Sequence, residues 1–317
     1  MEVIYKYQKI LDNDNISWIG LSRNPNPNAI YFLEKNIEKI NWSNLSSNPN
    51  AIHILENNIE KINWDNLSLN PNAIHLLEKN IDKINWSGWE VLSSNPNAIP
   101  ILEKNANKIN WYRFSKNPNA VTILKRNIDK IDWVSLSLNP NPDITCLIEN
   151  YIDKICWPHL SANPNFIYLL EDNINKISPS YLSRNPNAIE LLEKHPDKID
   201  LVSLAGNPNA IHLLEKNIDK IKPGWTGWSN LIGNPNALHI VLNKFKDNKG
   251  LVSRMASFVD NPNALHIIEK HLDVIHKNNW LYLSSNPGLF EIDYLAMSKQ
   301  RNKIIESELI VKANNFL

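Results

Sequence analysis

The sequence predicts an all-α fold, an α-solenoid of about twelve short two-helix repeats with a basic period of 22 residues. Three observations support this prediction: a recurring Asn-Pro-Asn tripeptide, helix-capping residues at fixed places, and columns of Trp and Leu that stay in register. The tripeptide recurs most often 22 residues apart, and the other gaps are 24, 25 or 27 residues. A fixed period of this size is typical of a repeat array, in which each unit buries its apolar face against its neighbours. The repeats open at Asn26, Asn48, Asn70, Asn95, Asn117, Asn163, Asn185, Asn207, Asn234 and Asn261, with altered copies at Asn141 and Asn286.

Residues 48–69 illustrate one unit. Asn48 is expected to cap a first helix, and Pro49 suits the first helical position. The helix should end near Asn58, because Asn tolerates the left-handed conformation that closes many helices. Equivalent Asn residues stand at Asn36, Asn80, Asn105, Asn127, Asn173 and Asn217. A second helix of under two turns should then begin after Asn63, another good N-cap residue, and present Trp64 and Leu67.

Leucine-rich repeats, which run at 20–29 residues, are the main structural rival. Their strand needs an apolar residue two places after the Leu equivalent to Leu67. That place is mostly polar in this chain, as at Ser47, Ser94 and Lys116. The pattern therefore favours helices.

The predicted organisation has three parts. Residues 1–17 are expected to form an N-terminal capping helix, residues 18–288 a continuous helical repeat array, and residues 289–317 a C-terminal helical cap. Terminal repeats need such covers because one of their faces has no neighbouring unit.

The composition limits the classes of function. The chain has 317 residues, 33 basic and 33 acidic side chains, and a net charge of zero. No apolar run is long enough for a membrane span, and the first residues lack the pattern of a signal peptide. Two cysteines in such a long chain, Cys146 and Cys156, are expected to be reduced thiols, as in an intracellular protein.

Nine tryptophans occupy one position of the repeat, three residues before a column of Leu or Phe. Together the two columns and the Ile positions predict one continuous core, so that Trp133→Ala is expected to cost about 3–5 kcal/mol. These tryptophans are Trp18, Trp42, Trp64, Trp89, Trp111, Trp133, Trp157, Trp228 and Trp280.

Trp86 and Trp225 fall outside this column, within insertions. Insertions in repeat proteins map to loops, often on the binding face. Trp is also enriched among residues that dominate binding energy. We therefore expect Trp86 and Trp225 to be partner-binding residues, with simple loop packing as the alternative.

Histidines recur at one position of the first helix, at His53, His75, His212, His239 and His266. Successive units stack roughly 8–10 Å apart, too far for one zinc ion to bridge two of them. Surface histidines are expected, with no metal site. The sequence also lacks a phosphate-binding Gly-rich loop, a nucleophile elbow and paired carboxylates outside the repeat pattern. It predicts no catalytic residues and no cofactor.

The unit NPNAI-x-LLEKN-I-D-K-INW resembles an Asn/Ile/Lys-rich repeat of uncharacterised proteins from giant DNA viruses, the mimivirus relatives. The resemblance spans roughly residues 18–290, at Asn26–Trp42, Asn70–Trp86 and Asn207–Ile221 among other places. It implies a viral origin and an intracellular setting, either host cytoplasm or the virion, and it implies no activity.

The favoured function is a non-catalytic protein–protein interaction scaffold with an unknown host or viral protein as partner, because solenoids offer extended concave surfaces. Two alternatives stand beside it. A nucleic-acid-binding helical repeat protein would use the Lys and Asn columns, but the adjacent acids, as in Glu60-Lys61 and Asp129-Lys130, disfavour a basic stripe. The other alternative is a structural component of the virion.

Overall fold

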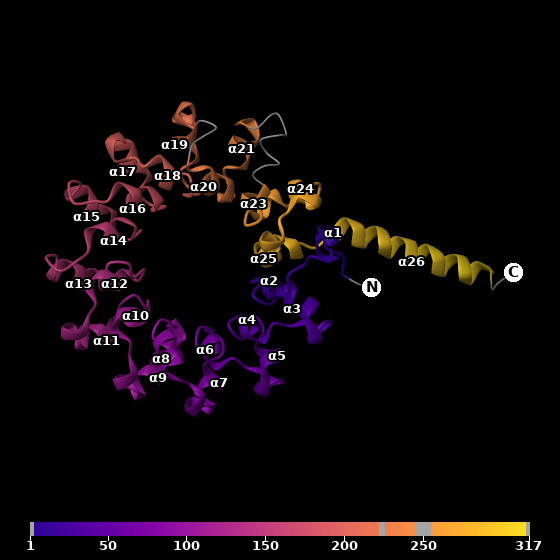
Figure 1. Cartoon of the computed structure of the whole chain (residues 1–317), viewed down its shortest axis with the longest axis horizontal. Coiled ribbons are helices and arrows are strands. Elements are labelled where there is room, and N and C mark those ends of the chain that lie inside the picture. The colour runs from indigo at the N-terminus through magenta and orange to yellow at the C-terminus, as the bar shows by residue number, and fades with distance from the viewer. Residues whose placement is uncertain (1–2, 222–225, 245–254, 315–317) are drawn as a thin grey trace.

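The computed structural model describes residues 3–221, 226–244 and 255–314. Over these ranges the chain is all-helical, with one isolated antiparallel bridge between Tyr5 and Ile292. The predicted all-α class is confirmed. Figure 1 shows pairs of short helices that follow one another around a ring, with one row on the inside and a second row on the outside.

The inner row consists of the short helices that contain the Trp/Leu positions. They are α2 (Trp18–Ser22), α4 (Trp42–Ser46), α6 (Trp64–Leu67), α8 (Trp86–Leu92), α10 (Trp111–Ser115), α12 (Trp133–Leu136), α14 (Trp157–Ser161), α16 (Pro179–Arg184), α18 (Leu201–Leu204), α20 (Trp228–Gly233), α23 (Met255–Phe258) and α25 (Trp280–Ser285).

The outer row consists of the helices that follow the Asn-Pro turns. They are α3 (Pro27–Glu34), α5 (Ile52–Glu56), α7 (Ile74–Lys79), α9 (Ile99–Lys104), α11 (Val121–Arg126), α13 (Thr145–Asn150), α15 (Ile167–Asp172), α17 (Ile189–Lys194), α19 (Ile211–Lys216), α21 (Leu238–Lys244) and α24 (Leu265–Ile268).

Short 3-10 helices complete many of the connections. They are η1 (Ile37–Lys39), η2 (Ile59–Lys61), η3 (Ile81–Lys83), η4 (Pro96–Ala98), η5 (Ala106–Lys108), η6 (Ile128–Lys130), η7 (Pro142–Ile144), η8 (Pro196–Lys198), η9 (Ile218–Lys220), η10 (Pro262–Ala264), η11 (Leu272–Val274), η12 (Lys277–Asn279) and η13 (Pro287–Phe290). The ends of the chain carry α1 (Gln8–Leu11) and the long helix α26 (Tyr294–Asn314).

The Asn residues that end the outer helices do so differently from the prediction. Asn58 has φ −142°, not a left-handed value, and the described residues contain no positive φ at all. Its side-chain Nδ2 instead donates to the carbonyl of Ile54 at 2.8 Å, which satisfies one of the unpaired groups at the helix end. Asn36, Asn80, Asn105, Asn127, Asn173 and Asn217 make the same bond four residues back.

The core is a continuous column of side chains between the two rows. The Leu or Phe of every described inner helix is fully buried, from Leu21 through Phe114 to Leu283. Most tryptophans of the neighbouring column lie only partly buried at its edge, whereas Trp89, Trp228 and Trp280 are buried. The Leu column thus forms the predicted core, and the Trp column mostly borders it.

A lysine of the following repeat covers many of these indole rings. Its Nζ lies between 4.6 and 5.4 Å from the ring centroid, within the range of a cation–π contact. The pairs are Lys39 with Trp18, Lys61 with Trp42, Lys83 with Trp64, Lys108 with Trp89, Lys130 with Trp111, Lys154 with Trp133, and Lys176 with Trp157.

Partial burial changes the expected cost of removing Trp133. We expect Trp133→Ala to cost less than the about 3–5 kcal/mol of a fully buried aromatic side chain, because its ring is already partly hydrated. Leu136→Ala, at a fully buried position of the same helix, should cost more than Trp133→Ala, about 2–5 kcal/mol. Urea unfolding followed by circular dichroism gives both values. A larger loss for Trp133→Ala than for Leu136→Ala would contradict this ranking.

A ladder of buried asparagines joins successive repeats. The Oδ1 of Asn48 accepts the N–H of Asn50, but α5 begins only at Ile52, with Ala51 at its N-cap. The expectation that Asn48 caps this helix and that Pro49 is its first residue is therefore wrong: this Asn closes the turn that precedes the helix. Its Nδ2 also donates to the carbonyls of Ser22 and Asn24 in the preceding repeat, at 3.1 and 3.0 Å. Asn48 therefore closes its own turn and also joins two successive repeats. The buried ladder comprises Asn24, Asn48, Asn70, Asn95, Asn117, Asn139, Asn163, Asn185, Asn207, Asn234, Asn261 and Asn286.

Asn-Pro occurs twice in succession at residues 24–27 and 139–142, and the ladder shows which Asn opens the repeat there. Asn24 and Asn139 occupy the buried ladder position, not Asn26 and Asn141. The following Asn takes the role that the second Asn of the tripeptide has elsewhere, and Asn141 Nδ2 donates to the carbonyl of Pro118. In the other repeats the second Asn bonds the preceding repeat: Asn50 Nδ2 donates to the carbonyl of Pro25 and Asn72 Nδ2 to that of Pro49.

A second ladder is formed by the Ser that follows the buried Leu. Ser115 Oγ donates to the carbonyl of Trp111 and accepts the N–H of Asp132 in the next repeat. Ser22, Ser46, Ser93, Ser137, Ser161 and Ser183 also accept an N–H from the next repeat. The Leu-Ser dipeptide recurs in the sequence and could have indicated this ladder.

The ring closes because the first and last repeats contact each other. Figure 1 shows α2 beside α25, and the same bonds that join sequential repeats connect them. Asn24 Nδ2 donates to the carbonyls of Ser284 and Asn286 at 3.0 and 2.9 Å. Ser284 Oγ accepts the N–H of Ser17 at 2.8 Å. We call this contact between α2 and α25 the seam.

The chain ends differ from the predicted caps. Residues 3–17 contain only the short helix α1, and Lys6 N–H donates to the Glu291 carbonyl while Asp293 N–H donates to the Ile4 carbonyl. These two hydrogen bonds join the N-terminal segment to residues 291–293 and so reinforce the seam. In residues 289–314, α26 extends away from the ring (Figure 1), and Tyr294 and Leu295 at its start are exposed. Each end of the array is thus covered by the other end.

Candidate functional site

Charge is distributed unequally between the two rows of helices. The inner-row helices contain four charged residues, Asp65, Glu90, Arg113 and Arg184, within the bounds given above. Glu90 and Arg113 form an ion pair at 3.1 Å, so half of these charges neutralise each other locally. The Glu-Lys and Asp-Lys pairs of the repeats lie instead on the outer helices and on the 3-10 helices. The inner row is therefore nearly neutral.

Exposed apolar side chains recur on this neutral row. Trp86, the first residue of α8, is 78% exposed and is the most exposed of them. Tyr112 on α10 is 55% exposed, with Lys116 Nζ lying 4.7 Å from its ring centroid. Ile19, Val134, Tyr181 and Tyr282 are also exposed on inner helices. Aromatic residues at accessible positions with few charges are typical of protein-binding surfaces.

The structure places the two predicted partner-binding residues as follows. The insertion at Trp86 forms no loop: it lengthens α8 by one turn, and Asn85 caps that turn by accepting the N–H of Gly88 at 2.9 Å. The loop prediction is wrong because the extra residues begin directly after a capping Asn and continue the helix. Trp89 then fills the buried column position and leaves Trp86 in solvent. Trp225 lies outside the described residues.

The outer row carries a series of ion pairs between adjacent repeats. His53 Nε2 lies 2.5 Å from Glu34 Oε1, and His75 pairs with Glu56, His212 with Glu193 and His239 with Glu215. These side chains are exposed, and the histidine is charged only when it is protonated, so each such pair contributes little to stability at neutral pH. The prediction that these histidines lie on the surface is confirmed for His53, His75, His212, His239 and His266.

Acid should weaken this outer series. His212 and, next, Lys216 donate hydrogen bonds to Glu193 and hold the pKa of its carboxyl below the ordinary value of 4.5. A lowered folded-state pKa contributes stability at neutral pH that disappears as the pH falls through that pKa. We expect Glu193→Gln to reduce the loss of Tm between pH 5 and pH 3. Glu103→Gln is the matched control, because Thr122 replaces the histidine in the next repeat. Identical pH profiles for wild type and Glu193→Gln would contradict this role.

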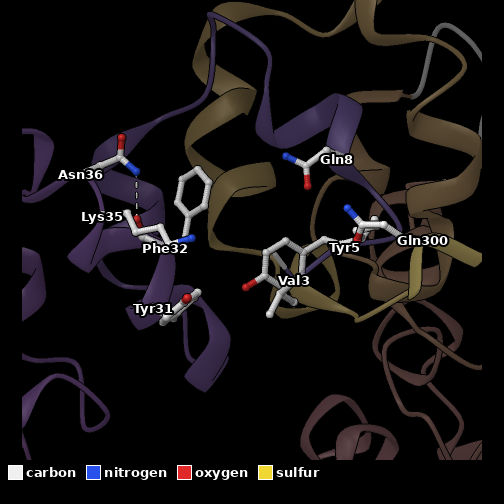
Figure 2. A pocket seen from close by; sticks show the side chains of 9 residues that line it. Val3, Tyr5, Gln8, Tyr31, Phe32, Lys35, Asn36 and Gln300 are labelled. Atoms are coloured by element: carbon white, nitrogen blue, oxygen red, sulfur yellow. Dashed lines mark hydrogen bonds between the residues drawn. The ribbon is translucent and has the colours of Figure 1, made fainter. Parts of the chain in front are cut away.

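A pocket of about 280 Å³ lies outside the inner row, where the N-terminal segment, α3 and α26 meet. Figure 2 shows Tyr5, Tyr31 and Lys35 among the side chains that line it. Burial raises the pKa of the Tyr5 hydroxyl. Gln300 Oε1 is buried there, with no hydrogen-bond partner among the described residues. The pocket results from three segments of the chain meeting beside the seam.

Other site types find no support in the described ranges. No group of three His, Cys, Asp or Glu side chains there is arranged to hold a metal ion. Cys146 and Cys156 are both unpaired. None of the described helices combines the length and the apolar character needed to cross a bilayer. Comparison with protein-family models, curated proteins and solved structures gives no match.

Proposed function

We propose that the chain is an α-solenoid of about twelve repeats, closed into a ring, that serves as a non-catalytic protein-interaction scaffold. Its partner would bind the inner row. The observation that carries this proposal is the nearly neutral inner row with Trp86 and Tyr112 exposed on it. Trp and Tyr are enriched among residues that dominate binding energy, and the fully buried centres of interfaces are depleted of charge.

The same distribution of charge argues against the nucleic-acid alternative. Nucleic-acid binding relies on Lys and Arg that neutralise phosphates and gives a steep salt dependence. Seven lysines of the connections between outer and inner helices, such as Lys61 and Lys83, lie over Trp rings. Those that end the outer helices, such as Lys79, stand beside acids. A mobility-shift assay with mixed RNA and DNA at low salt tests the alternative directly. Salt-sensitive binding at sub-micromolar concentration would favour nucleic acid over protein.

A giant-virus origin, with the host cytoplasm or the virion as location, is part of the proposal and is supported by the repeat motif alone. Affinity purification of the tagged chain from infected cells, with mass spectrometry, would identify the partner. Recovery of capsid proteins as the main partners would favour the virion structural role.

Trp86→Ala should weaken binding of such a partner. Truncating an anchor residue typically costs 2 kcal/mol or more, which is roughly a thirtyfold rise in Kd. Because Trp86 is exposed, the melting temperature should stay unchanged. Tyr31→Ala, which removes an exposed aromatic of the outer helix α3, is the matched control and should bind normally. Normal binding by Trp86→Ala, with weakened binding by Tyr31→Ala, would place the contact on the outer row.

A further inference from the structure

The seam joins two surfaces of the same chain that are complementary to each other and different from each other. At the seam, α2 presents Gly20, and α25 presents Leu281 and Ser284. A Cβ added to Gly20 would lie 2.4 Å from the Leu281 carbonyl oxygen, so the helices are in direct backbone contact. Opening the ring would expose both surfaces.

The bonds at the seam match those between sequential repeats. Asn24 donates to the Ser284 and Asn286 carbonyls as Asn48 donates to those of Ser22 and Asn24. Asn26 Nδ2 donates to the Pro287 carbonyl at 2.9 Å as Asn50 donates to that of Pro25 at 2.9 Å. The α2 surface therefore binds α25 through the same hydrogen bonds that join two repeats adjacent in sequence. These bonds do not require the two repeats to be consecutive in the chain.

We propose that the seam is a head-to-tail interface that a second copy of this chain can complete. When a ring opens, the α2 surface of one chain binds the α25 surface of another through the same hydrogen bonds. Such an interface is heterologous: two different patches meet, so repetition of the contact yields larger closed rings or open filaments. The occupant follows from complementarity, because each open chain carries both halves of the interface.

Closure within one chain and pairing between chains compete for the same surfaces. The array between α2 and α25 holds the two ends of one chain side by side, so the ring form should prevail in dilute solution. Pairing between chains should therefore emerge when closure within each chain is blocked and the complementary surfaces remain intact.

Two variants create this situation. Gly20→Arg blocks the α2 surface and leaves the α25 surface intact, whereas Ser284→Arg does the reverse. Neither chain can close, and neither can pair with a copy of itself. A mixture can form one native seam, between α25 of the Gly20→Arg chain and α2 of the Ser284→Arg chain. Gly233→Arg is the matched control, because a Cβ there meets nothing within 4 Å.

Size-exclusion chromatography with light scattering is the readout, with circular dichroism to establish folding. We expect each variant alone at the mass of one chain and the equimolar mixture at twice that mass. Gly233→Arg should stay at the mass of one chain when mixed with either variant. Folded variants that remain single chains in the mixture would overturn the proposal, as would equal association of each variant alone.

If either variant fails to fold, refolding the wild-type chain from urea at rising concentration gives the second test. Two-chain species should increase with concentration and persist after dilution. Single-chain protein at every concentration would overturn the proposal.

Discussion

Asn117→Asp is expected to destabilise the protein by about 3 kcal/mol or more, although Asp is as good a helix-capping residue as Asn. Asn117 is buried, and its Nδ2 donates to the carbonyls of Ser93 and Asn95 at 3.1 and 2.9 Å. Asp keeps an acceptor for the Asn119 N–H but has no donor. It also places a carboxylate against two carbonyl oxygens in a buried site, where an unpaired charge is costly.

Asn110→Asp is the matched control for this substitution. Asn110 only caps α10, accepting the N–H of Arg113 at 3.0 Å, and Asp132 already fills the same position in the next repeat. We expect less than about 1 kcal/mol for Asn110→Asp, and urea unfolding measures both variants. Equal, small losses for the two variants would mean that the bonds from Asn117 to the preceding repeat contribute little to stability.

The sequence predicts the inner helix of each repeat well because its signals are local, whereas outer helices such as α5 begin three residues later than the Asn-Pro pair suggests. Asn63 before Trp64 marks the start of an inner helix, and the structure shows its side chain accepting the N–H of Asn66. The Leu column is predicted because each of its residues stands three places after a Trp of the Trp column, as Leu67 does after Trp64. The helix-end bond of Asn58 was misassigned because both a left-handed residue and a side-chain donor can satisfy the last carbonyls, and sequence does not distinguish them.

The contacts between repeats are harder to predict, since the partners lie in a neighbouring unit. Counting donors would have found the Asn ladder: a buried amide has two N–H donors, and capping uses only its oxygen. The lysines over the Trp rings have a similar signal, because most of them follow their Trp by 19 residues, as Lys61 follows Trp42. For the candidate site, the sequence singled out Trp86 correctly as lying outside the buried column, but it gave α8 too few residues.

Ring closure has no such signal. It depends on a small rotation between neighbouring units that accumulates along the whole array, and no single residue pattern specifies that angle. The one local indication is Gly20, which stands in the inner helix where other repeats carry larger residues such as Asn44 and Asn66. The need for glycine at this position is seen only in the structure, where α25 packs against α2.

Gly20→Ala is expected to open the ring at the seam. A Cβ at this position would lie 2.4 Å from the Leu281 carbonyl oxygen and 2.7 Å from Ser284 Cβ, and real Cβ atoms do not approach backbone atoms so closely. Relief requires α2 to move away from α25, which stretches the hydrogen bonds of Asn24 to the Ser284 and Asn286 carbonyls. Overpacking of this kind typically costs about 1–3 kcal/mol.

Gly233→Ala separates this effect from the helical preference of Ala. Gly233 is the last residue of the inner helix α20, and an added Cβ there meets nothing within 4 Å. Ala in place of a helical Gly should stabilise by about 0.5–1 kcal/mol. Small-angle scattering should therefore show a larger radius of gyration for Gly20→Ala alone, together with a lower melting temperature. If Gly20→Ala instead behaves like Gly233→Ala, with unchanged scattering and a higher melting temperature, then α2 and α25 do not touch and the chain is an open array.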